Sequence, residues 1–372
     1  MIIFFRRRSQ TFSILLRMHS AMDIEERLSL VQKDVAGVIT EDDLRKVLAE
    51  KSRPKAYIGF EPSGMMHIGQ AINVLKVKEM EQAGIDCTIF LADWHAKIND
   101  KLGGDIEKIR ICGDYMRHCF LGFGVDPDRT KFLYASEIVN RSEYWEKFIH
   151  ISKASSLSRI KRAMTIMGRE EEDAETDFSK LIYPPMQVAD IFELDVDIAY
   201  GGMDQRHAHM LARDAAEKLG WRKPIAVHSW LLPSLSGSGR MDTAQKKMSK
   251  SDPKTSILVT DELDAIREKI SKGFCPAKDI QDNPVLAISE RIIFPAKGCF
   301  SLTRDEKFGG NLEFSSYDGL RDAYAAGKIH PEDLKKSSAI ELAGILAPVR
   351  KHFQNNPAPL KKMAELFSVG KK

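Results

Sequence analysis

Two short segments of the sequence carry residues suited to binding a phosphorylated ligand. The first is His67-Ile68-Gly69-Gln70, which follows the apolar run KAYIGF and opens the helical pattern of residues 67–84. The free N–H groups at the start of a helix bind anions, and His67 can add a hydrogen bond or a positive charge there. Gly69 lacks the side chain that would keep a flat base from the backbone. A simple helix-capping role for His67 is the alternative.

The second segment reads QKKMSKSDPKTS and covers residues 245–256. Its lysines alternate with serines, and Pro253 stops any helix that could form there. A solvated surface turn is one interpretation of this pattern. A loop that brings cations to a bound ligand is the other.

Strand and helix patterns alternate around these segments. Apolar runs predict strands at 55–60, 87–96, 130–137, 195–202 and 224–229, while helical periodicity covers residues 67–84, 106–124 and 204–218. Strands alternating with helices of this length predict an α/β fold with a Rossmann-like parallel sheet. The active site of such a fold lies at the carboxyl ends of the strands.

The strand pattern fades after Pro295, and the remaining chain reads as amphipathic helices that carry lysines. We therefore expect a Rossmann-like catalytic domain over residues 23–260 and a helical domain, with its linker, over residues 261–372. Residues 1–22 contain arginines but no Asp or Glu, as a mitochondrial transit peptide would. A disordered tail or a later start of translation explains the same composition.

Composition excludes some classes of protein and leaves others open. The chain has 372 residues, of which 43% are apolar and 29% charged, and no apolar run approaches the roughly 20 residues that span a bilayer. A formal charge of +3 requires any nucleic-acid contact to come from local patches. His207 and His209 lie two apart on a predicted helix and face different directions, so we expect no metal site and no zinc.

Taken together, the two segments resemble the signature motifs of class I aminoacyl-tRNA synthetases. From about Ser29 to Phe353 the chain is similar to the tyrosyl-tRNA synthetases of the archaeal and eukaryotic type. The stretches that carry this similarity are residues 57–64, 91–99, 183–214, 307–310 and 330–335. The resemblance implies a C-terminal helical domain that binds the anticodon.

The resemblance implies an ATP site between the two motifs, with His67, Gly69, Lys247 and Lys250 in catalytic roles. The lysines would hold the departing pyrophosphate, on a loop that closes only during reaction. Magnesium would arrive with ATP, held by phosphates and water. Gln70 stands where the commonest motif has a second histidine, so one phosphate contact is weakened or replaced by an amide hydrogen bond. The expected ATP-binding residues are Gly59, His67, Gly69, Gln70, Lys247, Met248, Ser249, Lys250 and Ser251.

The resemblance also assigns a pocket for L-tyrosine. Tyr57 and Asp190 would bind the phenol, and Tyr183, Gln187 and Gln205 the α-amino group. The spacing of Tyr183, Gln187 and Asp190 places them on one face of a helix, which we expect to start after Pro184 and Pro185. A packed aromatic ring and a helix cap are the alternatives for Tyr57 and Asp190. His95 is expected to line the same pocket.

Contacts with tRNA(Tyr) follow from the resemblance as well. Arg206 matches a residue that reads the first base pair of the acceptor stem, and Phe308, His330 and Asp333 match residues that hold the first anticodon base. A helix cap at His330-Pro331-Glu332-Asp333 is the alternative. A homodimer is implied, with residues 111–144 at or near its interface.

The function implied is that of a tyrosine–tRNA ligase, which forms tyrosyl-adenylate from ATP and then transfers tyrosine to the tRNA. A tryptophanyl-tRNA synthetase shares the fold but should lack the Tyr57 and Asp190 pair. A non-catalytic tRNA-binding protein is a third possibility, against which the intact His67, Gly69, Lys247 and Lys250 speak. We expect a cytoplasmic enzyme, while the basic N-terminus leaves mitochondrial targeting open.

Overall fold

The computed structural model describes residues 22–168, 177–237, 248 and 256–368. The N-terminal extension expected over residues 1–22 therefore lies almost wholly outside the described residues. Across the described ranges, no helix combines the length and the apolar character needed to cross a bilayer.

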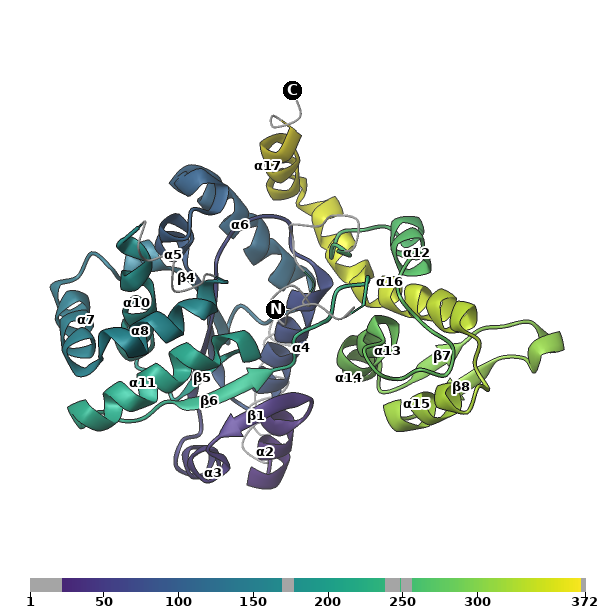
Figure 1. The fold of residues 1–372 in the computed structure, drawn as a ribbon, viewed down its shortest axis with the longest axis horizontal. Coiled ribbons are helices and arrows are strands. Elements are labelled where there is room, and N and C mark those ends of the chain that lie inside the picture. The colour runs from purple at the N-terminus through teal and green to yellow at the C-terminus, as the bar shows by residue number, and fades with distance from the viewer. Residues whose placement is uncertain (1–21, 169–176, 238–247, 249–255, 369–372) are drawn as a thin grey trace, which may run out of the picture.

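A six-stranded sheet forms the centre of the larger part of the molecule (Figure 1). Its order is β1-β6-β5-β2-β3-β4, and β2, β3, β4, β5 and β6 run parallel. The predicted α/β fold is confirmed. The strands are β1 (Val35–Ile39), β2 (Lys55–Phe60), β3 (Asp86–Leu91), β4 (Thr130–Tyr134), β5 (Ile198–Gly202) and β6 (Ile225–Ser229).

Two sequence-based expectations about this sheet need correction. β1 was not predicted, and it pairs antiparallel with β6 at the edge of the sheet. The strand expected over residues 87–96 ends at Leu91, because helix α5 (Asp93–Ile98) begins directly after it. His95 therefore projects from a helix at the carboxyl end of β3.

Helices cover both faces of the sheet. Ile58 and Ile89 pack in one apolar cluster with α4 and α6, while the alternate residues Tyr57 and Phe90 pack in another with α10 and α11. This alternation is what a strand buried on both faces requires. The helices of this part are α2 (Ile24–Gln32), α3 (Glu41–Glu50), α4 (Ile68–Gln82), α5, α6 (Ile106–Gly122), α7 (Ser142–Ala154), α8 (Leu157–Ala163), α10 (Ser179–Glu193) and α11 (Arg206–Leu219).

Helix α10 starts earlier than expected. It begins at Ser179 and contains Pro184 and Pro185, which remove two backbone N–H donors from its second turn. Nearly every residue from Tyr183 to Ile191 is buried, so tertiary packing offsets the lost hydrogen bonds. Tyr183 thus lies inside the helix, with Gln187 and Asp190 on the turns that follow.

The C-terminal part is mostly helical, but it also contains a small antiparallel hairpin that the sequence pattern did not reveal. Its strands β7 (Phe300–Leu302) and β8 (Leu312–Phe314) are too short to show an alternating pattern. The helices are α12 (Leu263–Ser271), α13 (Pro284–Ile288), α14 (Phe294–Lys297), α15 (Tyr317–Ala325), α16 (Pro331–Asn355) and α17 (Pro357–Ser368). A π-helical turn, η6 (Ser289–Ile293), joins α13 to α14.

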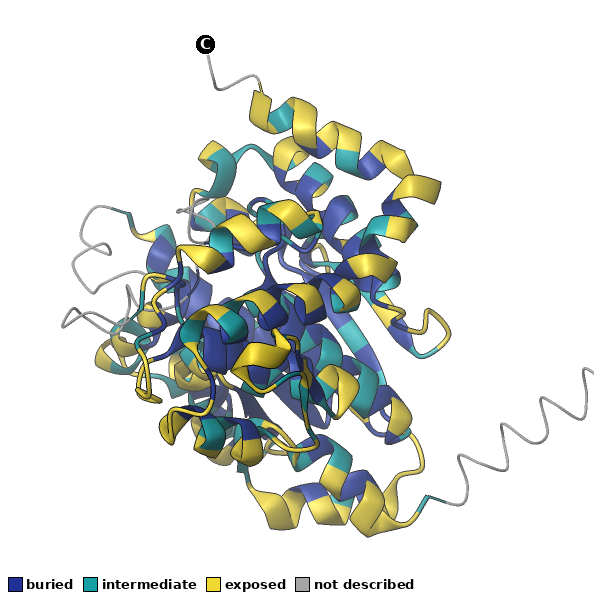
Figure 2. Cartoon of the chain, turned by 90° about the vertical axis from the view of Figure 1, so that its right-hand side faces the viewer, coloured by how far each residue is buried: buried dark blue, intermediate teal, exposed yellow. Residues whose placement is uncertain are grey.

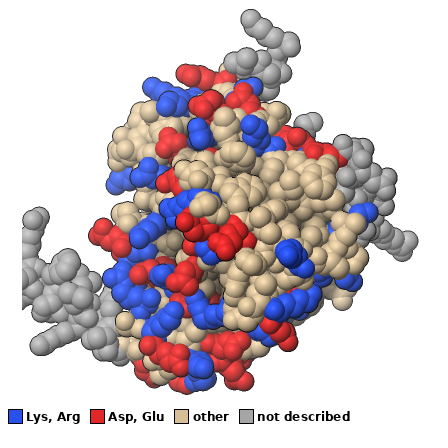
Figure 3. Space-filling model, turned by 90° about the vertical axis from the view of Figure 1, so that its left-hand side faces the viewer, with Lys and Arg blue, Asp and Glu red and all other residues tan. Residues whose placement is uncertain are grey.

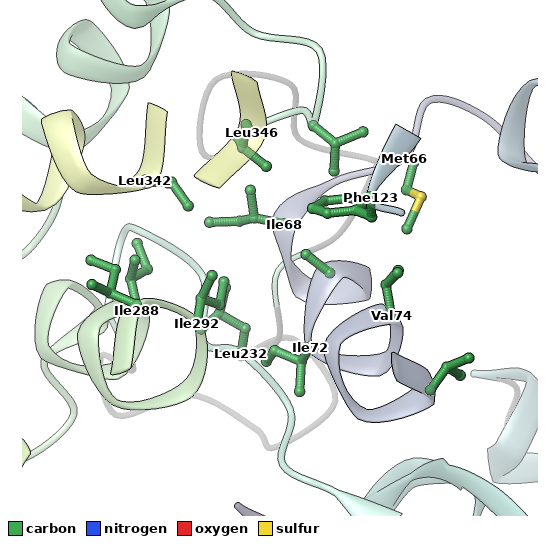
Figure 4. Close-up of a cluster of buried hydrophobic side chains, with 14 of the residues drawn as sticks. Met66, Ile68, Ile72, Val74, Phe123, Leu232, Ile288, Ile292, Leu342 and Leu346 are labelled. Atoms are coloured by element: carbon green, nitrogen blue, oxygen red, sulfur yellow. The ribbon is translucent and has the colours of Figure 1, made fainter. Parts of the chain in front are cut away.

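One apolar core runs through both parts of the chain. Ile68 and Ile72 of α4 lie beside side chains of η6 and α16, among them Ile292 and Leu346 (Figure 4). Buried residues continue along the inner faces of the helices of both parts (Figure 2). The domain boundary at residue 260 stays a prediction, and the two parts share their packing.

The crossing of α6 and α16 depends on a glycine. A Cβ atom added at Gly122 would lie 2.9 Å from the Cα of Val349 and 3.2 Å from the Cβ of His352. We expect Gly122→Ala to lower the free energy of unfolding by about 1–3 kcal/mol, because backbone must move to make room. Denaturant unfolding measures the change.

Gly344 in α16 provides a matched control. A Cβ atom there would meet nothing within 4 Å, so Gly344→Ala should raise the free energy of unfolding by roughly 0.5–1 kcal/mol. Equal effects of the two substitutions would contradict the close crossing at Gly122.

Candidate active site

A cavity of about 540 Å³ opens at the carboxyl ends of the parallel strands. This is where the α/β fold places its ligands. Residues from β2, α4, α5, α10, β5 and β6 contribute to its walls. The expected site residues among them are Tyr57, Gly59, His67, Gly69, Gln70, His95, Tyr183, Gln187, Asp190, Gln205 and Met248.

Asp190 is a buried carboxylate on the wall of this cavity, with only 1% of its surface exposed. Its Oδ1 accepts a hydrogen bond of 2.9 Å from the hydroxyl of Tyr144, and its Oδ2 lies 3.0 Å from His95 Nε2. Burial is the largest single influence on His95 and lowers its pKa, but the charge and contact of Asp190, together with the charges of Glu61 and Asp93, outweigh burial, and the pKa is raised. The carboxylate is therefore compensated on two sides and still has lone pairs for a further donor.

Tyr57 lies against the same region of the cavity and is 2% exposed. Burial, followed by the nearby charge of Asp190, raises the pKa of its phenol, so the hydroxyl stays protonated at neutral pH. A neutral hydroxyl and a carboxylate together present both a donor and an acceptor to a polar group of a ligand.

Tyr144 was not among the expected site residues. It marked the end of the range expected near a dimer interface, but its side chain is fully buried within the chain between α7 and α10. Its sequence surroundings, SEYWEKF, read as an ordinary amphipathic helix, and its partner Asp190 lies 46 residues away. The sequence around Tyr144 thus gives no signal of this contact.

Glu61 is a second residue that the sequence reasoning missed. Its Oε1 accepts hydrogen bonds from the hydroxyl of Tyr183 at 2.6 Å and from Asn99 Nδ2 at 3.0 Å, and its Oε2 lies 3.5 Å from the ammonium of Lys101. Its place just after β2, at the carboxyl end of a central strand, was the available signal.

Gln187 and Gln205 meet on the wall of the cavity. Gln187 Nε2 donates to Gln205 Oε1 at 3.1 Å, and Gln205 Nε2 donates to the carbonyl of Ile166 at 3.1 Å. Within the described part of the chain, Gln187 Oε1 is buried and has no hydrogen-bond partner. An acceptor left open in this way suits a ligand that brings N–H donors.

The first motif forms the start of α4. His67 caps this helix, since its Nδ1 accepts from the backbone N–H of Gly69 at 3.1 Å, while Gln70 Oε1 accepts from the N–H of His67 at 3.2 Å. The capping alternative is thus what the structure shows, and both residues still line the cavity. A Cβ at Gly69 would lie 2.9 Å from the ring of His67, so this glycine makes room for the capping histidine itself.

Of the second motif only Met248 is described, and Lys247, Ser249, Lys250 and Ser251 lie outside the described residues. Met248 is buried, and its N–H donates to the carbonyl of Leu232 at 2.8 Å. Further along, Ile257 accepts from the N–H of Ile68 at 2.9 Å, and the N–H of Val259 donates to Met66 at 3.0 Å. Met248 within the second motif is therefore hydrogen-bonded to Leu232, and the chain that follows the motif is hydrogen-bonded to the residues around His67.

The residues expected to contact tRNA lie outside the cavity. Arg206 opens α11 next to Gln205 and is exposed. Phe308 is 62% exposed, with the ammonium of Lys307 5.0 Å from the centre of its ring. His330 caps α16, since its Nδ1 accepts from the N–H of Glu332 at 3.2 Å, and Asp333 lies in the first turn of the same helix. The capping alternative at this position also matches the structure.

A buried pair of histidines lies near Gln205. His209 Nδ1 and His228 Nε2 are 3.1 Å apart, and both residues are at most 1% exposed. Burial, followed by the other ring's charge, lowers the pKa of His209 to about 3, and burial, followed by the charge of Arg206, lowers that of His228 to about 4. Both rings are thus neutral near pH 7. Within the described ranges, no three His, Cys, Asp or Glu side chains cluster as metal ligands would.

This pair predicts a pH dependence of stability. Because each folded-state pKa lies below the ordinary value of 6.5, the unfolded chain takes up protons first as the pH falls. We expect the free energy of unfolding to fall between about pH 6.5 and pH 4, and to fall less steeply in His228→Asn. Denaturant unfolding across this pH range measures both slopes.

His330→Asn, at the exposed start of α16, is the control, because asparagine can also cap a helix and the substitution leaves the pair intact. An identical pH dependence in wild type and His228→Asn would contradict the predicted neutrality of the buried rings.

Comparison with known proteins places this fold and cavity among the synthetases. The model of the family described as tRNA synthetases class I (W and Y) matches residues 49–347. A tyrosine–tRNA ligase of Sulfolobus acidocaldarius is 48% identical over 344 residues, which are 90% of this chain and 95% of the relative. The crystal structure of the tyrosyl-tRNA synthetase from Aeropyrum pernix is 43% identical, with a TM-score of 0.84, and covers 93% of this chain and 100% of its own.

A second similar structure was solved with a ligand bound to it. The tyrosyl-tRNA synthetase from Pyrococcus horikoshii, crystallised with L-tyrosine, is 41% identical with a TM-score of 0.86. It covers 92% of this chain and 100% of its own. The similarity in sequence and in fold thus extends over most of the chain.

Proposed function

The chain belongs to the tyrosyl-tRNA synthetases of class I, with the activity of a tyrosine–tRNA ligase that uses ATP, and on this premise we propose which residues perform each step. The buried carboxylate of Asp190 in the cavity is the observation that carries the proposal. Tyr57 and Asp190 bind the phenol of tyrosine, and the carboxylate of Asp190 accepts a hydrogen bond from the phenol hydroxyl. Phenylalanine would leave both groups unpaired and is therefore rejected.

The α-amino group of tyrosine lies between the two glutamines and Tyr183. Gln187 Oε1, buried and open, accepts one N–H of the ammonium. Glu61 holds the hydroxyl of Tyr183 in place and adds negative charge near the ammonium. In this orientation the carboxylate of tyrosine is directed toward the start of α4.

ATP binds with its phosphates at the start of α4, near His67 and Gly69. A carboxylate oxygen of tyrosine attacks the α-phosphorus, and the bond to pyrophosphate breaks. Lys247 and Lys250 hold the leaving pyrophosphate, while Ser249 and Ser251 add hydroxyl donors. Magnesium enters with ATP on its phosphates, and we propose no zinc. A terminal ribose hydroxyl of tRNA(Tyr) then attacks the carbonyl carbon, and AMP leaves.

The anticodon is read in the C-terminal part. The exposed ring of Phe308 offers a face on which an unpaired base can stack, and Asp333 can accept from a base edge. His330 combines this role with its capping of α16. Arg206 reads the acceptor stem next to the cavity.

We also propose a homodimer in the cytoplasm. The face on the side of α7 has a broad area without charged side chains (Figure 3). Trp145 and Ile149 of α7 are exposed to 40% and 55% and follow directly on the range 111–144. Large apolar side chains exposed on a surface are typical of an interface between subunits.

Amino-acid-dependent exchange between ATP and pyrophosphate tests the substrate. We expect exchange with tyrosine, but not with tryptophan or phenylalanine, and Asp190→Ala should lower kcat/KM for tyrosine on the order of 100-fold. Tyr144→Phe, which removes the hydroxyl that donates to Asp190 and to the carbonyl of Met186, should have a smaller effect in the same direction. Asp264→Ala, which changes a highly exposed carboxylate of α12, is the control. Exchange with tryptophan would overturn the phenol site, and no exchange at all would favour the non-catalytic alternative.

Aminoacylation kinetics test the anticodon contact. Phe308→Ala should raise KM for tRNA about tenfold, because base stacking on an aromatic ring is worth roughly 1–3 kcal/mol. The KM for tyrosine in exchange should change far less. Phe367→Ala, another exposed phenylalanine in α17, is the matched control. If both variants shift KM for tRNA equally, Phe308 has no special contact with the anticodon.

A further inference from the structure

Trp230 is an aromatic residue of the cavity that stays in solvent. It follows β6 directly, at the carboxyl end of the sheet, and lines the cavity with 47% of its surface exposed. Phe90, Tyr57 and Tyr183 line the same cavity and are 1%, 2% and 6% exposed. Trp230 therefore lies at the mouth of the cavity, where its ring can be covered by a ligand that approaches from outside.

One side of this ring is already held by a cation. The guanidinium carbon of Arg291 lies 5.4 Å from the centre of the ring, and Arg291 also donates a hydrogen bond to the carbonyl of Leu231. Arg291 belongs to the π-helical turn η6, a type of turn that is rare and often found at functional sites. The cation–π contact orients the indole before any ligand arrives.

The chemistry of a half-exposed indole beside a guanidinium matches an unpaired nucleic-acid base. Bases that are not paired in a duplex are bound by stacking on aromatic rings and on arginine planes. The second step of the proposed reaction needs such a base here, because the single-stranded end of the tRNA must bring its terminal ribose to the cavity.

The base of ATP fits this position less well. The wall beside Gly69 offers the base of ATP a separate apolar surface, made by Leu232 and Met248, which are 3% and 4% exposed. Small ligands of this size are usually buried over most of their surface. We propose that Trp230 and Arg291 form a stacking platform for the terminal base of tRNA. This inference rests on the proposed function.

The test compares two substrates in Trp230→Ala and in Trp230→Phe, which keeps a smaller aromatic face. We expect Trp230→Ala to raise KM for tRNA in aminoacylation about tenfold, at least five times more than it raises KM for ATP in pyrophosphate exchange. Trp230→Phe should recover most of the loss. In a binding assay, Trp230→Ala should weaken tRNA(Tyr), but should not weaken further a tRNA(Tyr) shortened by its terminal adenosine.

The other outcomes each overturn the inference. A larger rise in KM for ATP than for tRNA would assign the ring to the base of ATP. Equal weakening of the complete and the shortened tRNA would place the contact elsewhere on the tRNA. Unchanged kinetics would show that the indole of Trp230 only packs against Arg291 and contacts no substrate. Wild-type exchange with tyrosine separates these results from a failure of the proposed function, since its absence would refute the function and not only the platform.

Discussion

The backbone pairing between residues 66–68 and residues 257–259 ties the chain that follows the second motif to the first motif, and we propose that the chemistry depends on these two motifs. Ile68 donates to Ile257 and Val259 donates to Met66, so the chain that returns from the second motif is hydrogen-bonded around His67. These residues also form the start of α4. His67 caps this helix, and Ile68 packs in the apolar core that both parts of the chain share. A shift of α4 would therefore alter two things together: the end of the cavity at which we propose that the phosphates of ATP bind, and the packing of the C-terminal helices.

The amino-acid end of the cavity depends on a different constraint, which is the cost of burying a carboxylate. An isolated buried charge is strongly unfavourable, and Asp190 is stable only because Tyr144 and His95 compensate it from two helices. These partners also fix the direction of the carboxylate before a ligand binds. In the proposed site, the protein itself thus prepares the recognition of a hydroxyl, because these contacts hold the carboxylate in one orientation.

Much of this arrangement follows from local patterns, and the rest depends on contacts between distant residues. The central strands show as apolar runs, and their carboxyl ends bring Tyr57, His67 and Gln205 to one cavity. The spacing of Tyr183, Gln187 and Asp190 places them on one face even though the helix starts before the prolines. β1 is a short edge strand whose partner lies almost 200 residues away, and Tyr144 contacts Asp190 across 46 residues, so no local pattern reports either one.

The shared apolar core has a consequence for how this chain can be shortened. Ile68, Ile72 and their neighbours on α4 would face water if the C-terminal helices were removed, and an exposed patch of this kind promotes aggregation. A minimal fragment cut after β6 would need polar replacements on α4, yet those residues are continuous with the motif that we propose binds the phosphates. The C-terminal part, for which we propose anticodon binding, thus also supports the packing of α4, and gene fusions or truncations have to treat both parts as a single module.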